Sequence, residues 1–187
     1  LIDSGIDRFK IEGRMKTALY VATVARTYRK AIDDYLESPE LYRKNMDWYL
    51  DQISNFTYRQ FTTGFFFGTP DESAQIYDNN TYVKAYTYLG IIGECTADGL
   101  YRIEQRNKFS VGEQIEIMKP DGRNIPVVVR RIVDEEGQEM QSAPHPKQVL
   151  YIELAAAENG ALSGAEVSEQ DNHAAELYDI LRRKEEE

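Results

Sequence analysis

The stretch that decides the fold runs from residue 82 to residue 154 and centres on Gln114-Ile115-Glu116-Ile117-Met118, Pro120-Asp121-Gly122 and Ile125-Pro126-Val127-Val128-Val129-Arg130-Arg131-Ile132-Val133. Each apolar run is short, and the Pro, Asp and Gly residues between the runs favour tight chain reversals. Predicted strands cover residues 82–94, 100–105, 114–118, 125–133 and 149–154. So many short strands predict a small closed antiparallel β-barrel, because closing the sheet removes its unpaired edges.

The sequence before this stretch predicts one strand and two helices. Residues 5–13 alternate, with Phe9 and Ile11 on one face and Lys10 and Glu12 on the other, as in a strand. Apolar positions then recur every three or four residues, as on a helix: Val21, Ala25, Tyr28, Ile32 and Tyr35 between residues 17 and 37, then Tyr42, Met46, Tyr49 and Ile53. Ser38-Pro39 separates the two helices, because Ser caps a helix and Pro fits its first turn.

The expected fold class is therefore α+β, with two domains. Residues 1–70 hold the strand, the helices and a packed aromatic connector, and the polar residues 71–81 form a linker. Residues 82–187 form the barrel and a C-terminal helix, which starts after Asn172 and has an apolar face of Ala174, Leu177, Ile180 and Leu181.

Composition excludes several classes of protein. The 187 residues are 42% hydrophobic and 29% charged, as in ordinary globular proteins. The chain is too short for a complete (β/α)₈ barrel, which needs about 250 residues, and its apolar runs are far below the roughly 20 residues of a membrane helix. Cys95 is the only cysteine, which excludes an intrachain disulfide and a cysteine-rich metal site and favours the reducing cytoplasm.

Charge is distributed unevenly. The net charge is −10, but residues 82–131 carry 8 basic and 6 acidic groups, whereas residues 132–187 carry 4 basic and 14 acidic groups. The basic candidates for RNA binding are Arg102, Arg106, Lys108, Arg130 and Arg131. With the aromatic residues Tyr101 and Phe109 beside them, they predict a face that holds phosphates and stacks bases. A solvated face, with Glu104 and Glu116 interleaved, explains the same pattern equally well.

Lys10, Glu12 and Arg14 are the candidate catalytic residues. Charges on one face of a strand whose other face is apolar lie in a polar cavity, in an ion pair or in solvent, and the sequence leaves these alternatives open. Neither His145 nor His173 has the partner spacing of a metal site, so no metal site is predicted and both are expected at the surface. Cys95 is expected to act as a small hydrophobic residue.

Several separated blocks resemble the C-terminal region of peptidase family U32, the collagenase-like proteins. They are Phe9-Lys10-Ile11-Glu12-Gly13-Arg14-Met15-Lys16, Tyr20-Val21, Thr27-Tyr28-Arg29, Thr62-Thr63-Gly64-Phe65-Phe66-Phe67-Gly68, Arg106-Asn107-Lys108-Phe109 and His145-Pro146-Lys147. The resemblance implies a longer parent in which a catalytic (β/α) barrel precedes a small β-barrel. The present chain would then hold the last strand and helix of the catalytic barrel. Lys10, Glu12 and Arg14 match the family's Lys-Ile-Glu-Gly-Arg block at the catalytic face.

The same resemblance implies two activities. The family is named for collagen-degrading peptidases, and other members are needed for prephenate-dependent 5-hydroxylation of tRNA uridine, with a cysteine-bound iron–sulfur cluster. We expect the second activity for the parent, with the β-barrel as an accessory RNA-binding or assembly module. The alternatives are a peptidase domain and a non-catalytic protein-interaction barrel.

Expectations for cofactors and partners follow from the same resemblance. The chain alone is expected to be inactive and to hold no cofactor, and an iron–sulfur cluster would lie in the preceding part of the parent. The expected partners are tRNA or another RNA, the parent's own N-terminal barrel and, through the exposed first strand and helix, a second copy of the chain. No membrane contact is expected.

Overall fold

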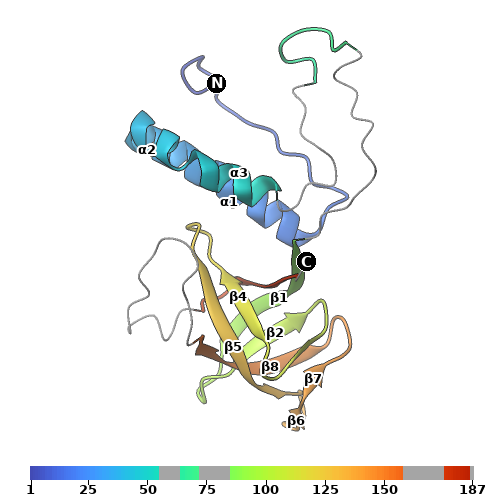
Figure 1. Ribbon diagram of the computed structural model, residues 1–187. Coiled ribbons are helices and arrows are strands. Elements are labelled where there is room, and N and C mark those ends of the chain that lie inside the picture. Colours follow the sequence, from blue (N-terminus) through green and yellow to red (C-terminus); the bar gives the residue numbers. More distant parts are fainter. Residues whose placement is uncertain (55–63, 72–84, 158–174, 186–187) are drawn as a thin grey trace. The chain divides into compact units, whose positions relative to one another are not determined.

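The computed structural model describes residues 1–54, 64–71, 85–157 and 175–185 (Figure 1). Within it the chain divides into two compact units, Leu1–Ser54 and Asn55–Glu187. Apart from Asp71, the predicted linker lies outside the described residues. The predicted domain limits therefore stay a prediction.

The first unit is helical after residue 17. Its helices are α1 (Ala18–Glu37), α2 (Pro39–Lys44) and α3 (Met46–Ser54). The Ser38 hydroxyl accepts a hydrogen bond from the backbone N–H of Leu41 at 3.0 Å, which confirms its role as a helix cap. The predicted second helix is thus present, but it is divided at Asn45 into α2 and α3.

The predicted apolar stripe of α1 is wrong over its first half. Val21, Ala25 and Tyr28 are exposed, whereas Thr23 and Thr27, on another face of the helix, are buried. Polar contacts with α3 account for this rotation of the helix about its axis. They include the hydrogen bond from the Arg26 guanidinium to the Gln52 side-chain oxygen and the bonds to Asp34, which faces the same way.

The buried carboxylate of Asp34 is hydrogen-bonded to three neighbouring side chains. Its oxygens accept hydrogen bonds from the Tyr49 hydroxyl, from Asn45 Nδ2 at 2.8 Å and from Lys30 Nζ at 3.1 Å. Burial raises the pKa of Asp34, but together these donors lower it by a larger amount. The pKa therefore lies below its ordinary value. The stability that the ionised group adds is present above the unfolded-state pKa, about 3.9, and is lost as pH falls through the lower folded-state pKa.

The predicted strand over residues 5–13 is wrong. The segment is not paired as a β-strand, and Phe9, Lys10, Ile11 and Glu12 are all exposed. A strand is stabilised by hydrogen bonds to a neighbouring strand, and the described residues of the first unit contain none. Alternation of apolar and polar residues therefore identifies a segment that is able to pair as a strand. It does not show that a partner strand is present.

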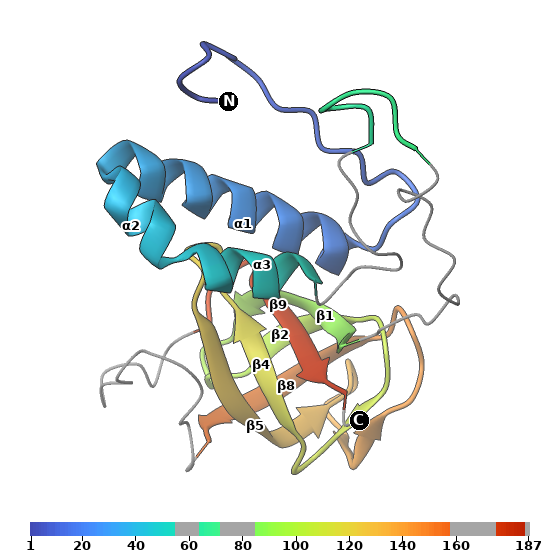
Figure 2. The ribbon, with the colours of Figure 1, turned by 45° about the horizontal axis from the view of Figure 1, so that its top comes forward.

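The second unit is a closed antiparallel barrel of six strands (Figure 2). The strands follow the order β4, β9, β1, β2, β8 and β5, and β5 pairs again with β4. The bounds of the strands are β1 Tyr86–Cys95, β2 Tyr101–Gln105, β3 Phe109–Ser110, β4 Gln114–Met118, β5 Asn124–Val133, β6 Glu139–Met140, β7 Ser142–Ala143, β8 Val149–Ala156 and β9 Ile180–Lys184. β6 pairs with the C-terminal end of β5, and β3 pairs with β7. The predicted fold class and closed barrel are confirmed.

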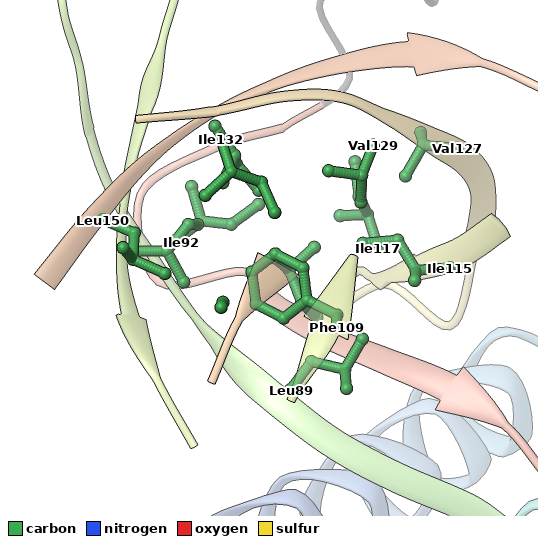
Figure 3. Close-up of a cluster of buried hydrophobic side chains, with 13 residues drawn as sticks. Leu89, Ile92, Phe109, Ile115, Ile117, Val127, Val129, Ile132 and Leu150 are labelled. Atoms are coloured by element: carbon green, nitrogen blue, oxygen red, sulfur yellow. The ribbon is translucent and has the colours of Figure 1, made fainter. Parts of the chain in front are cut away.

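Apolar side chains from all six barrel strands fill the interior (Figure 3). The buried cluster consists of Leu89, Ile92, Ile103, Phe109, Ile115, Ile117, Val127, Val129, Ile132, Ala143, Leu150, Ile152 and Leu181. Phe109 is fully buried although it lies on the short β3, because it reaches into the same cluster. The interior is a packed core.

The predicted C-terminal helix is wrong, because residues 180–184 form the strand β9. β9 lies between β1 and β4, with Leu181 opposite Gly90 on one side and Ile117 on the other. Leu177 and Leu181 would share one face of a helix, but Leu177 is 51% exposed and Leu181 is fully buried. The predicted start of that helix, Asn172, lies outside the described residues.

Replacing Leu181 tests this strand. Leu181→Ala removes a core side chain and is expected to lower the free energy of unfolding of the barrel by about 2–5 kcal/mol. Leu177→Ala makes the same chemical change at an exposed site and should stay within about 0.5 kcal/mol of the wild type. Urea unfolding measures the free energy of unfolding of both variants, and hydrogen exchange of the β1 and β4 amides shows whether the loss is at these strands. Equal losses would support the helix instead.

The carboxylate of Asp34 is tested with pH. Asp34→Ala leaves Tyr49 and Asn45 without their acceptor and should lower the free energy of unfolding of the first unit by about 1–3 kcal/mol at neutral pH. Asp33→Ala removes the neighbouring carboxylate, which is exposed and pairs with Arg29, and is the matched control. The difference between Asp34→Ala and the wild type should shrink as pH falls below about 4. A difference independent of pH would contradict the assignment.

Candidate nucleic-acid interface

The three predicted catalytic residues lie on an exposed segment before α1. Lys10, Glu12 and Arg14 are all exposed, and the Glu12 carboxylate accepts a hydrogen bond from the backbone N–H of Arg14 at 2.8 Å. Gly13 lies so close to α1 that an added Cβ would be 2.8 Å from Val21 Cγ2. The segment thus passes close to α1 at Gly13, where a larger residue would require the Val21 side chain to move, and it presents two cations and one carboxylate to solvent.

The predicted connector is described only from Gly64 onward, and there its aromatic residues are exposed, with the Phe66 and Phe67 rings in edge-to-face contact with each other. Phe65, Phe66 and Phe67 are each more than two-thirds exposed, between Gly64 and Gly68, which both have positive φ. The packed connector expected from the sequence is therefore wrong for this part of the chain.

The predicted basic residues of the barrel fall into two groups. Arg106 Nη2 lies 2.6 Å from Glu104 Oε1, and Arg131 Nε lies 2.9 Å from Glu139 Oε1. Arg102, Lys108 and Arg130 are exposed and have no acidic partner among the described residues. Of the two interleaved carboxylates expected from the sequence, Glu104 thus pairs with a predicted basic residue, whereas Glu116 pairs with Arg182 of β9.

One part of the predicted base-stacking face is wrong. Phe109 is fully buried in the core, so its ring is inaccessible to a base. Tyr101 is half-buried at the start of β2, and burial raises the pKa of its hydroxyl. Of the aromatic residues near the exposed cations, Tyr151 of β8 lies directly opposite Arg102 in the sheet.

Gln105 joins two loops that are distant in the sequence, a contact that sequence reasoning missed. Its buried side-chain nitrogen donates hydrogen bonds to the carbonyl oxygens of Asn107, at 3.1 Å, and of Ala143. Its backbone N–H donates to the carbonyl of Gln148 at 3.1 Å, and its own carbonyl accepts from Lys147 at 2.8 Å. No pattern around Gln105 signals this, because a single glutamine at the end of a predicted strand does not reveal which loops its side chain contacts.

Sequence reasoning also missed a buried ion pair before β9. Lys119 Nζ lies 2.8 Å from Asp179 Oδ2 and 2.8 Å from Glu176 Oε2, with Lys119 and Asp179 both buried. Burial lowers the pKa of Lys119, but the two carboxylates raise it more, so its pKa is above the ordinary value. The pair attaches the turn before β9 to the end of β4 and is structural.

β9 itself carries a buried arginine, Arg182. Its guanidinium lies 2.8 Å from Glu116 of β4 and 3.8 Å from the centre of the Tyr86 ring of β1. Because the side chain is fully buried, it is not available to bind RNA.

The described residues do not fit the metal cluster that the resemblance implies for the family. They contain no group of three or more His, Cys, Asp or Glu side chains able to hold a metal ion. Cys95 is exposed at the end of β1, which corrects its expected role as a small buried residue. His145 is exposed as expected, and His173 lies outside the described residues. No described helix is long and apolar enough to cross a membrane.

Comparison with known families matches both units. Residues 1–76 match the family described as "Peptidase family U32". Residues 84–163 match the one described as "Peptidase family U32 C-terminal domain". These two ranges make up most of the chain. The chain belongs to peptidase family U32.

Two curated relatives match about four-fifths of this U32 chain. It is 36% identical over 155 residues to tRNA hydroxylation protein P1 of Bacillus subtilis (strain 168), covering 82% of this chain and 36% of that protein. It is 31% identical over 156 residues to tRNA hydroxylation protein P of Escherichia coli (strain K12), covering 81% and 33%. The U32 chain therefore spans about a third of the length of these curated relatives.

A solved structure is also similar. It is the C-terminal domain of a Geobacillus thermoleovorans protein assigned to the U32 peptidases, which is 24% identical, with a TM-score of 0.36, and the match covers 53% of this chain and 92% of that one.

Proposed function

We propose that this U32 chain works in the 5-hydroxylation of tRNA uridine in the cytoplasm, as part of an RNA-modifying protein. The observation that carries the proposal is the identity of 31–36% to two tRNA hydroxylation proteins over about four-fifths of the chain. The match includes both units, so it extends beyond the barrel.

The exposed segment before α1 supplies the groups for the reaction. Lys10 and Arg14 are cations that can hold an anionic group of the substrate, such as a phosphate or a carboxylate. Glu12 is a carboxylate that can accept a hydrogen bond or a proton. The bond from the Arg14 backbone to Glu12 keeps the carboxylate beside the second cation.

The barrel acts in this proposal as an accessory RNA-binding module. Its basic residues Arg102, Arg106, Lys108, Arg130 and Arg131 supply contacts to phosphates, which position an RNA without reading its sequence. Assembly with the rest of the parent protein, and self-association through the first 35 residues, also stay predictions.

A gene deletion tests the proposed function. In a strain that lacks the gene, we expect mass spectrometry of tRNA nucleosides to show loss of 5-hydroxyuridine and its derivatives. The whole gene should restore them, and the gene carrying Lys10→Ala, Glu12→Ala and Arg14→Ala should not.

A matched triple variant controls for the loss of surface charge. Arg43→Ala, Lys44→Ala and Glu40→Ala also remove two cations and one carboxylate, from exposed positions on α2. This variant should restore the modification. Unchanged nucleosides in the deletion strain would refute the function, whereas restoration by the first triple variant would refute only the site.

A further inference from the structure

We propose that the RNA backbone binds at one edge of the barrel, formed by Arg102, Lys108 and Lys147 around Gln105, and we call this the Gln105 edge. The inference rests on the proposed function and gives its RNA contact a location. It includes Lys147, which lies outside the set of basic residues predicted from the sequence, and it excludes Arg131 and Arg106.

The first step of the argument is that two loops meet at this edge. The loop after β2 carries Lys108, and the loop before β8 carries Lys147 (Figures 1 and 2). Gln105 holds them together, since its backbone carbonyl accepts from Lys147 N–H at 2.8 Å and its side chain donates to Asn107, the residue before Lys108. Arg102 lies three residues earlier on the outer face of β2.

The second step is that the backbone at both lysines is fixed before any ligand binds. Lys147 has a φ of 69°, a left-handed conformation that costs free energy for a residue other than glycine and persists where its surroundings hold it. The carbonyl of Lys108 accepts a hydrogen bond from Arg183 Nη1 at 3.3 Å, and the next residue, Phe109, is buried. A fixed backbone lowers the ordering cost of binding.

The third step is the availability of the charges. Arg102, Lys108 and Lys147 are exposed, and none has an acidic partner among the described residues. In contrast, Arg123 Nε lies 2.8 Å from Asp121, and Arg131 Nε lies 2.9 Å from Glu139. A paired arginine has to give up its carboxylate before it binds a phosphate, whereas an unpaired cation releases only counterions.

The fourth step concerns the kind of ligand. Exposed lysines on fixed loops bind phosphate groups as point charges. Such contacts do not select a nucleotide sequence. The net charge of −10 disfavours long-range attraction of a polyanion, so binding depends on these short-range contacts. Tyr151, opposite Arg102 on β8, adds an aromatic residue next to one of the three cations.

The experiment measures binding of an unmodified tRNA transcript to the 187-residue chain over a range of KCl concentrations by fluorescence anisotropy. Lys108→Ala with Lys147→Ala should weaken binding and make the plot of log K against log[KCl] shallower by roughly one unit per lysine. Arg29→Ala with Arg123→Ala removes the same charge from two paired arginines outside the set proposed to contact RNA, and should leave the slope close to that of the wild type. Lys108→Arg with Lys147→Arg should keep the affinity.

Several outcomes would overturn the Gln105 edge. They are equal losses in the two alanine variants, no tRNA binding by the wild type, or binding of an acidic peptide in place of tRNA. Far-UV circular dichroism checks that each variant is folded. Failure of the edge is distinguishable from failure of the proposed function, because the nucleosides of the deletion strain report the function without reference to the barrel.

Discussion

Closure of the barrel depends on one short strand, Ile180–Lys184. β1 and β4 do not pair with each other, and β9 supplies the hydrogen bonds between them. Without it, both strands would have unpaired edges and the interior would be open along one side. The ion pair of Lys119 with Asp179 holds the turn that leads into β9. Removing either partner would leave a buried charge, a change that costs about 3–5 kcal/mol in such pairs.

The sequence predicted five of the six barrel strands close to their observed bounds, and their turn chemistry explains why. Pro120-Asp121-Gly122 connects β4 to β5, and Gly122 has the positive φ that such a turn requires. β9 has five residues, as do β2 and β4, but it was missed because its apolar residues Ile180 and Leu181 are consecutive and do not alternate with polar ones. Its neighbours Ala174 and Leu177 complete a helical spacing, and the buried Arg182 resembles a solvated residue in the sequence.

The first unit shows a different limit of pattern reading. The apolar spacing correctly indicated that α1 is a helix, but not which side of it is buried. That side is set by the bonds of Asp34 with Tyr49 and Asn45, which lie on a later segment. An unpaired polar group is costly to bury, so a helix turns its polar residues inward when partners for them exist. Hydrophobic periodicity contains no information about such partners.

The candidate site was predictable in part for a related reason. Arg102 and Lys108 stand out in the sequence because they lie in its locally basic segment. Lys147 lies in an acidic segment, and the hydrogen bond from its backbone N–H to the Gln105 carbonyl brings it to the end of β2. The pairing of β5 with β6 likewise places Glu139 beside Arg131, whereas Lys108 has no acidic partner among the described residues. The charge available to a ligand is thus a property of strand pairing, so counting basic residues along the chain both overestimates and underestimates the interface.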